Sequence, residues 1–271
     1  VSASPLLARC EPYAGKVPED AVVLTCGVDC QDDRLEAEVV GWGLGEECWG
    51  IEYKTIYGSI TNPATWSQLE QWITQPWEHE SGVHLRVASA MIDTGYQSKI
   101  VYDFCKPREV NRFFAIKGVA GANRPIVSRP ARSNSGKVAL FSLGVDSAKE
   151  LLYSRLKIDQ AGAGYCHFPI GNGYDDEYFE QLTAEKAVLR VKNGQKQRVW
   201  QKTRARNEAL DVRVYALSAF VNLNANLDQL AKSLKAKSID ERKTQTPQVD
   251  TFQAIKNRPP RRQGFVNSWK T

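Results

Sequence analysis

The sequence between residues 21 and 56 contains three strand-like segments separated by short turns. These segments cover residues 21–28, 34–42 and 47–56. In the second segment apolar residues alternate with charged residues, which is typical of a strand with one buried face. Because only a few residues connect one segment to the next, the strands must pair antiparallel. We therefore expect the fold to begin with a three-stranded antiparallel meander.

After residue 60 the pattern changes to helices that alternate with strands. Asn62 is a suitable N-cap and Pro63 a suitable first helical residue for a helix that ends before Pro76. The later segments are predicted as a strand at 84–92, a helix at 97–105, a strand at 112–116, a loop at 118–136, a strand at 138–143, a helix at 146–158, a short acidic helix at 174–182, a hairpin formed by 187–191 and 197–201, and a helix at 206–223. This alternation predicts an α/β fold with a mixed sheet flanked by helices.

The length of 271 residues fits one large domain with flanking segments. Residues 1–20 contain three prolines and a glycine and are predicted to form a linker that leads into the domain at 21–223. The segment 224–271 is predicted to be a basic, flexible tail unless a partner binds it. Because the first residue is Val1 rather than Met, we expect the chain to be a fragment of a longer polypeptide.

The positive charge is concentrated near the C-terminus. The whole chain carries a formal charge of +5, and residues 226–271 contain ten Lys or Arg against four Asp or Glu. The rest of the chain is therefore close to neutral. No apolar run is long enough to span a bilayer, and the N-terminus lacks the pattern of a signal peptide. We expect an intracellular protein.

The cysteines and histidines do not indicate a metal or nucleophile site. None of the six cysteines forms a C-x-x-C pair, and the three histidines lie far from any zinc-like cysteine spacing. The cysteines are predicted to be free thiols in a reduced compartment, packed as small apolar groups. Because no histidine has a triad-like setting, catalysis by a serine or cysteine nucleophile is disfavoured.

Three aspartates occur within or directly after apolar segments. Asp29 ends the first strand, Asp93 ends a later strand, and Asp211 lies on the predicted helix at 206–223. Carboxylates rarely enter a core without a compensating partner, so three such positions suggest a shared Mg²⁺ or Mn²⁺. Two strand ends and a covering helix are the arrangement that a two-metal phosphoryl-transfer site requires. The alternative is that each aspartate is a separate turn or cap residue.

Two stretches of the domain are rich in cationic residues. Residues 117–137 contain five Lys or Arg and no acidic residue, and residues 186–206 contain eight. Either stretch can contact a phosphate backbone, although charge runs are usually solvated faces. The loop at 118–136 and the hairpin that turns at Asn193-Gly194 are therefore candidates for holding DNA. Their candidate DNA-binding residues are Arg124, Arg129, Arg132, Lys192, Lys196, Arg198 and Lys202.

The densest acidic cluster lies on the predicted helix at 174–182. Its members are Asp175, Asp176, Glu177 and Glu180. Because they crowd together on one short helix, a solvated face is a better interpretation than a metal site.

Five motifs, taken in order, resemble the nuclease domain of lambda-type phage terminase large subunits, within the ribonuclease H-like superfamily. The resemblance covers about residues 21–222 and depends on the ordered set rather than on any one motif. The motifs are Gly27-Val28-Asp29-Cys30-Gln31-Asp32-Asp33-Arg34-Leu35-Glu36, Ile92-Asp93-Thr94-Gly95-Tyr96, Ala115-Ile116-Lys117-Gly118, Tyr178-Phe179-Glu180-Gln181-Leu182-Thr183-Ala184-Glu185 and Arg206-Asn207-Glu208-Ala209-Leu210-Asp211.

The resemblance implies a ribonuclease H-like mixed sheet and a metal-dependent DNA endonuclease that cuts concatemeric viral DNA during packaging. It assigns Asp29, Asp93 and Asp211 as catalytic ligands of two Mg²⁺ or Mn²⁺ ions. Auxiliary roles are possible for residues close to them in the motifs, although a hairpin turn or a solvated strand end also explains these residues. They are Asp32, Asp33, Glu208 and Lys117.

The family also implies an upstream ATPase domain and several partners. The partners are double-stranded DNA, a small terminase subunit and, through the C-terminal tail, the procapsid portal, with no membrane involved. The expected location is the cytoplasm of an infected bacterial host. Residues 134–138 lack the first glycine and the final hydroxyl of a phosphate-binding loop, so ATP hydrolysis is not predicted for this chain.

The same residues are compatible with two other functions. Another ribonuclease H-like polynucleotidyl transferase, such as a resolvase or transposase, would use the same three carboxylates. A noncatalytic DNA-binding or assembly module would retain them without binding metal.

Overall fold

The computed structural model describes residues 1–13, 15–133, 137–192 and 195–245. A mixed eight-stranded sheet, in the order β10-β3-β2-β1-β6-β7-β9-β8, forms its centre. The strands of this sheet are β1 (Val23–Cys30), β2 (Arg34–Trp42), β3 (Cys48–Tyr57), β6 (Val87–Asp93), β7 (Phe113–Val119), β8 (Ala131–Arg132), β9 (Ala139–Gly144) and β10 (Cys166–His167). Two small two-stranded sheets are formed by β4 (Trp77–Glu78) with β5 (His84–Leu85) and by β11 (Glu185–Lys192) with β12 (Gln195–Lys202).

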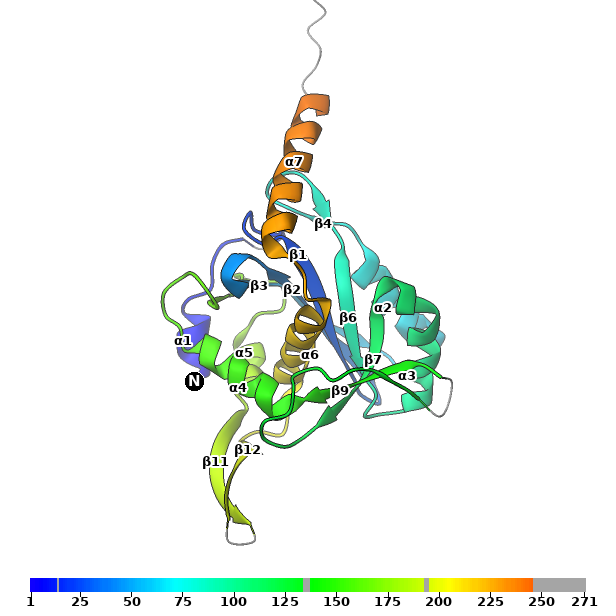
Figure 1. Cartoon of the computed structure of the whole chain (residues 1–271), viewed down its shortest axis with the longest axis vertical. Helices are drawn as coiled ribbons and strands as arrows, with labels where there is room; N and C mark the ends of the chain where they lie inside the picture. Colours follow the sequence, from blue (N-terminus) through cyan, green and yellow to red (C-terminus); the bar gives the residue numbers. More distant parts are fainter. Residues whose placement is uncertain (14, 134–136, 193–194, 246–271) are drawn as a thin grey trace, which may run out of the picture.

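Helices cover both faces of the main sheet (Figure 1). The α-helices are α1 (Ala3–Leu7), α2 (Pro63–Thr74), α3 (Ser98–Cys105), α4 (Val145–Leu156), α5 (Asp176–Leu182), α6 (Glu208–Leu223) and α7 (Leu227–Gln245), and two 3-10 helices lie at η1 (Leu44–Glu46) and η2 (Lys106–Asn111). One apolar core includes buried residues of α4, α5 and α6, and the other includes buried residues of α2 and α3. The sheet therefore separates two cores. No helix in the described part of the chain is long and apolar enough to cross a membrane.

The predicted architecture is confirmed. Strands β1, β2 and β3 pair antiparallel, and β1, β6, β7 and β9 then pair parallel to one another. The start of α2 is also as predicted, because the Asn62 side chain accepts a hydrogen bond from the backbone N–H of Ala64 and Pro63 follows it.

Two predicted boundaries were wrong. The single strand expected at 84–92 is divided, because β5 pairs with β4 in a separate small sheet while β6 pairs with β1. The segment 118–136, expected to be a loop, contains the end of β7 and the short strand β8, which pairs antiparallel with β9. In both cases the pairing partner, which local sequence does not reveal, decides where the strand begins or ends.

Both ends of the described chain contain helices. In the first twenty residues α1 packs with α5, and its Leu6 side chain is buried. At the other end, α7 occupies residues for which flexibility was predicted, and Leu234 on this helix packs with Val22 and Val83. The remainder of the predicted tail, residues 246–271, lies outside the described residues.

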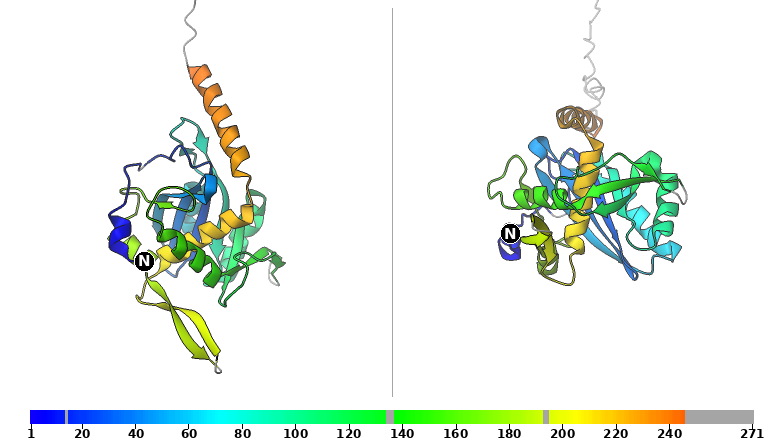
Figure 2. Two further views of the ribbon diagram at one scale, coloured as in Figure 1. Left: turned by 60° about the vertical axis from the view of Figure 1, so that its left-hand side comes forward. Right: turned by 60° about the horizontal axis from the view of Figure 1, so that its bottom comes forward.

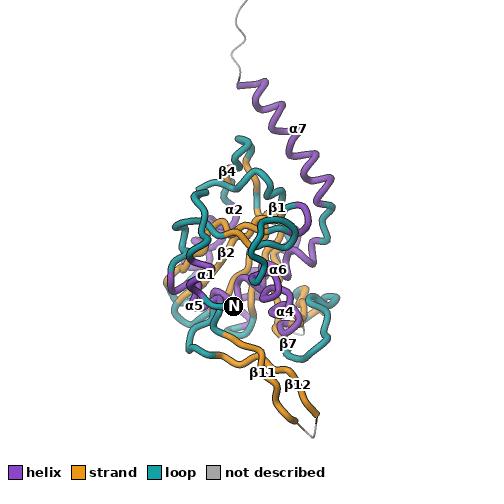
Figure 3. The backbone as a smooth tube through the Cα atoms, turned by 90° about the vertical axis from the view of Figure 1, so that its left-hand side faces the viewer, coloured by secondary structure: helices purple, strands orange, loops and turns teal. Residues whose placement is uncertain are grey.

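Two elements project from the body of the domain. The hairpin formed by β11 and β12 extends from one end, and α7 extends from the other (Figure 2). A view from the side shows the same arrangement (Figure 3). The hairpin thus leaves most of its length free of contact with the main sheet, while its root lies beside α4, α5 and α6.

Candidate active site

The register of two neighbouring parallel strands brings Asp29 and Asp93 together. Val28 on β1 is paired with Ile92 on β6, and each aspartate is the next residue of its strand. Residues at equivalent positions of adjacent parallel strands point to the same face of the sheet. Asp29 and Asp93 therefore lie side by side at the same edge and on the same face.

A close contact between β1 and α6 brings the third aspartate to this edge. Gly27 faces α6, and a Cβ atom at this position would lie 2.0 Å from the backbone oxygen of Val212. Two residues earlier on the same face, the Thr25 hydroxyl donates to the backbone oxygen of Ala216 at 2.8 Å. Because strand residues alternate between faces, Asp29 points to the same side as Gly27 and lies near the first turns of α6, which carry Asp211.

The electrostatics of the three carboxyl groups show that they are neighbours. Burial raises the pKa of Asp29 to about 7, with additional upward contributions from Asp211, Asp93 and Glu208 and a downward one from the hydrogen bond with Gln31. Burial likewise raises the pKa of Asp211 to about 6, and nearby Lys149 opposes this shift. The pKa of Asp93 is also raised, mainly by burial. Several acidic groups thus share a poorly solvated region that disfavours their ionisation.

Each of the three carboxylates has a hydrogen-bond donor from the protein. Gln31 donates to Asp29 at 2.5 Å, the backbone N–H of Gly95 donates to Asp93 at 2.9 Å, and Asn207 donates to Asp211 at 3.0 Å. Within the described ranges, no group of three or more Asp, Glu, His or Cys side chains is arranged to hold a metal ion.

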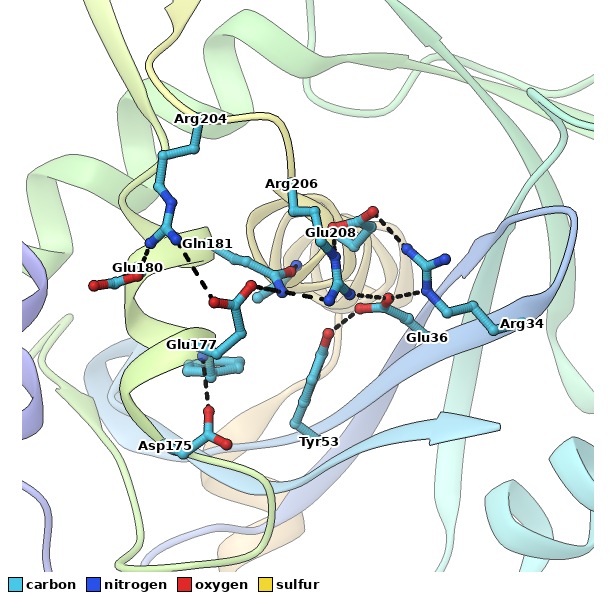
Figure 4. Close-up of polar contacts among 12 residues, drawn as sticks. Arg34, Glu36, Tyr53, Asp175, Glu177, Glu180, Gln181, Arg204, Arg206 and Glu208 are labelled. Atoms are coloured by element: carbon cyan, nitrogen blue, oxygen red, sulfur yellow. Dashed lines mark hydrogen bonds and ion pairs between the residues drawn. The ribbon is translucent and has the colours of Figure 1, made fainter. Parts of the chain in front are cut away.

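A network of ion pairs fixes the first turn of α6 to the antiparallel strands (Figure 4). Glu36, fully buried on β2 and paired in register with Asp29, accepts from Arg34 and Arg206, each at 2.6 Å. The same two arginines contact Glu208, at 2.8 Å and 3.3 Å. This ring of two arginines and two glutamates holds α6 beside β1 and β2 and thereby supports the position of the aspartates.

The auxiliary candidates have different surroundings. Glu208 is engaged by the two arginines and lies close enough to Asp29 to raise its pKa. Asp33 is in the turn between β1 and β2, where its carboxylate pairs with Arg34 at 2.7 Å, and neighbouring Asp32 accepts from the hydroxyl of Tyr96. Lys117 is exposed on β7, directly after Ile116, which is paired with Asp93. Glu208 is thus near the three aspartates, whereas Asp33 is occupied at the turn. Lys117 lies at the same edge of the sheet as Asp93 but, as the residue after Ile116, on the opposite face.

The acidic cluster on α5 has structural partners. The Asp175 side chain accepts from the backbone N–H of Tyr178 as the N-cap of the helix. Glu177 and Glu180 form ion pairs with Arg204, which lies between the hairpin and α6. These contacts attach the segment after β12 to α5 (Figure 4).

The candidate DNA-binding residues lie on two separate surfaces. Arg124, Arg129 and Arg132 are exposed between β7 and β9, and Arg132 forms an ion pair with Glu109 at 2.9 Å. On the hairpin, Arg198 contacts Glu150 at 2.7 Å. The Lys202 ammonium group donates inward to the side chain of Asn207 at 2.6 Å, and the side chains of Lys192 and Lys196 lie outside the described residues.

Sequence reasoning missed three polar residues around Asp211. Lys149 on α4 contacts Glu185 at 2.8 Å and Asp211 at 3.8 Å, and Asn207 donates to both of these carboxylates. Lys149, Glu185 and Asn207 are all buried. Asn207 and Glu185 belong to recognised motifs, but nothing in the sequence around Lys149 separates it from an ordinary helical lysine.

The six cysteines are free, and five of them are buried. Of the histidines, His167 contacts Glu11 and Glu47, and His79 contacts Ser81, at places away from the three aspartates. His79 and His167 are therefore engaged with partners outside the candidate site.

Comparison with known proteins decides the family. The model of the endonuclease domain of the terminase large subunit gpA matches residues 1–233. The chain belongs to this family. The terminase large subunit of Escherichia phage lambda is 36% identical over 217 residues, which cover 78% of this chain and 34% of the phage lambda protein. The terminase large subunit of Enterobacteria phage P21 is 32% identical over 243 residues, which cover 86% of this chain and 37% of that protein.

This terminase endonuclease domain spans about a third of the length of the curated relatives that it matches. No solved structure matches it. The family assignment confirms the resemblance found in the sequence motifs.

Proposed function

We propose that this terminase endonuclease domain hydrolyses phosphodiester bonds of double-stranded DNA with divalent metal ions held by Asp29, Asp93 and Asp211. The observation that supports this proposal most strongly is the approach of α6 to β1 at Gly27, which gathers carboxylates from two strand ends and one helix. Separate turn or cap residues would not need to converge in this way.

The chemistry of the donor set fits Mg²⁺ or Mn²⁺. Both ions prefer oxygen ligands, and burial raises the pKa values of Asp29 and Asp211 because their ionised forms are poorly solvated, an effect that a bound cation would offset. A pair of such ions supplies activation of the attacking water and stabilisation of the leaving oxygen. Each of these carboxylates accepts its protein hydrogen bond at a single oxygen, so the other oxygen would be available as a metal ligand.

The remaining residues of the site position these groups and the substrate. Gln31 orients the Asp29 carboxylate, and the Arg34–Glu36–Arg206–Glu208 ring holds the start of α6. We assign Glu208 to this ring, and we assign Lys117 to a contact with a DNA phosphate at the same edge of the sheet. Exposed cations of the segment 124–132 and of the hairpin would contact further phosphates, which positions DNA without reading its sequence.

The wider function is that of a packaging terminase. We propose that the whole protein cuts concatemeric viral DNA, that a preceding ATPase domain drives packaging, and that a small terminase subunit selects the site. The basic C-terminal segment would contact the procapsid portal. These roles rest on the membership of the terminase family and on the fact that the chain spans only part of its relatives.

A plasmid-cleavage assay with Mg²⁺ or Mn²⁺ tests the nuclease proposal. We expect the wild-type domain to convert supercoiled DNA to nicked and linear forms, and Asp29→Asn, Asp93→Asn and Asp211→Asn each to abolish this activity. Asp176→Asn, an equal change of charge at an exposed position of α5, is the control and should cleave normally. If all three site variants fold and cleave like wild type, the proposed mechanism is wrong.

A further inference from the structure

Asn207 is the N-cap residue of α6, but its side chain does not cap this helix. The two other capping residues described above behave differently, because Asn62 accepts from a backbone N–H of α2 and Asp175 accepts from a backbone N–H of α5. Capping by asparagine or aspartate is favourable for a helix. Asn207 therefore directs its side chain to other partners at the expense of a normal cap.

The Asn207 amide instead joins two carboxylates. Its nitrogen donates to Glu185 at 2.9 Å and to Asp211 at 3.0 Å. Its oxygen accepts from the ammonium group of Lys202 at 2.6 Å. Only 4% of Asn207 is exposed, so these contacts are shielded from water. An asparagine is suited to this position because it offers two amide hydrogens and an acceptor at the same time.

The partners of Asn207 form the root of the hairpin. Glu185 is the first residue of β11, and it is paired in register with Lys202, the last residue of β12. Lys149 neutralises Glu185 at 2.8 Å and lies 3.8 Å from Asp211. The amide of Asn207 is thus a short connection between both strands of the hairpin and the carboxylate of Asp211.

We propose that Asn207 is a positioning residue that holds the Asp211 carboxylate for divalent-metal binding and links it to the root of the β11–β12 hairpin. This inference rests on the proposed function, since it assigns Asp211 to metal binding. Groups that orient a metal ligand typically change metal affinity or activity by about 10–100-fold when they are removed.

Asn207→Ser is the informative variant because serine caps a helix about as well as asparagine but has no amide group to join the two carboxylates. We expect the metal-free variant to fold but to unfold at a lower temperature than wild type, because Glu185 and Asp211 lose a buried donor. We also expect the Mn²⁺ concentration for half-maximal plasmid cleavage to rise by about tenfold or more. Asn62→Ser makes the same change at an asparagine that does cap its helix and should leave the Mn²⁺ dependence unchanged.

The increase in Tm caused by Mn²⁺ without DNA provides a second readout that does not require cleavage. At a fixed Mn²⁺ concentration this increase should be smaller in Asn207→Ser than in wild type. Lys202→Met, which removes the donor to the Asn207 oxygen from the hairpin, should reduce the increase in the same direction. This variant also tests the inference if Asn207→Ser fails to fold.

The outcomes separate this inference from the nuclease proposal. If wild type does not cleave DNA but its Mn²⁺-dependent increase in Tm is reduced by Asn207→Ser, the nuclease proposal fails and the positioning role stands. If wild type cleaves DNA and both Asn207→Ser and Lys202→Met retain its Mn²⁺ dependence and its increase in Tm, the positioning role is wrong.

Discussion

Replacing Gly27 with alanine should displace α6 from β1 and misalign Asp211 with Asp29. The added Cβ would lie 2.0 Å from the backbone oxygen of Val212 and 2.7 Å from the backbone nitrogen of Ala216. Ordinary contacts of a carbon atom require about 3.5 Å, so the helix must move by roughly 1–1.5 Å. Neither close atom belongs to a flexible side chain that could turn away.

This displacement has two consequences of different size. Overpacking of this kind costs about 1–3 kcal/mol of the free energy of unfolding, which a domain can survive. A shift of about 1 Å in a catalytic group can reduce the rate by about 100-fold. We therefore expect Gly27→Ala to fold, with a lower midpoint in urea unfolding, and to lose about 99% of its plasmid-cleavage rate.

Leu217→Ala is a suitable control for the loss of stability. Leu217 is buried on α6 beyond the contact with Gly27, and its truncation should cost about 2–5 kcal/mol without moving the first turns of the helix. At a temperature at which both variants are folded, Leu217→Ala should cleave close to the wild-type rate. If Gly27→Ala also cleaves at the wild-type rate, then the close approach of α6 does not position the site.

Three further predictions concern pH, the core and DNA binding. Burial raises the pKa of Asp29 from 3.8 to about 7 in the folded protein, so without metal the free energy of unfolding should fall as pH rises from about 4 to 7. Urea unfolding at several pH values with a chelator present would measure this fall, and a stability that does not change with pH would contradict the prediction. Arg213 and Glu38 form a fully buried ion pair at 2.7 Å, so Arg213→Met should lower the free energy of unfolding by about 3–5 kcal/mol. Adding Glu38→Gln should recover part of this loss, and calorimetry that finds no loss of stability in Arg213→Met would contradict the prediction. Replacing Lys196 and Arg198 with alanine should weaken DNA binding and reduce its dependence on salt, and equal binding at low and moderate salt would count against the hairpin as a DNA contact.

The sequence predicts the sheet well because local patterns decide most of it. The first three strands are joined by short turns that force antiparallel pairing, and the start of α2 follows from Asn62 and Pro63. The strand expected at 84–92 was predicted wrongly because β5 pairs with β4, a choice that depends on tertiary contacts. The helical state of α7 was missed because its composition is polar, although Leu234 packs into a small apolar cluster.

The candidate site was predictable in its main carboxylates but not in its supporting contacts. Asp29 and Asp93 stand out because each ends an apolar strand, and Asp211 stands out on an apolar helix. Lys149 cannot be found in the same way, because its contact with Glu185 joins residues 36 positions apart. The diversion of Asn207 from capping is likewise visible only when the positions of its side-chain partners are known.

The most direct test of the central claim is the anomalous diffraction of Mn²⁺ in crystals of the domain grown near neutral pH. We expect anomalous peaks within coordination distance of oxygens of Asp29, Asp93 and Asp211, and their loss in a crystal of Asp29→Asn. A fully ordered site without manganese at saturating concentration, or manganese bound only elsewhere, would contradict a metal-dependent nuclease site at these three aspartates.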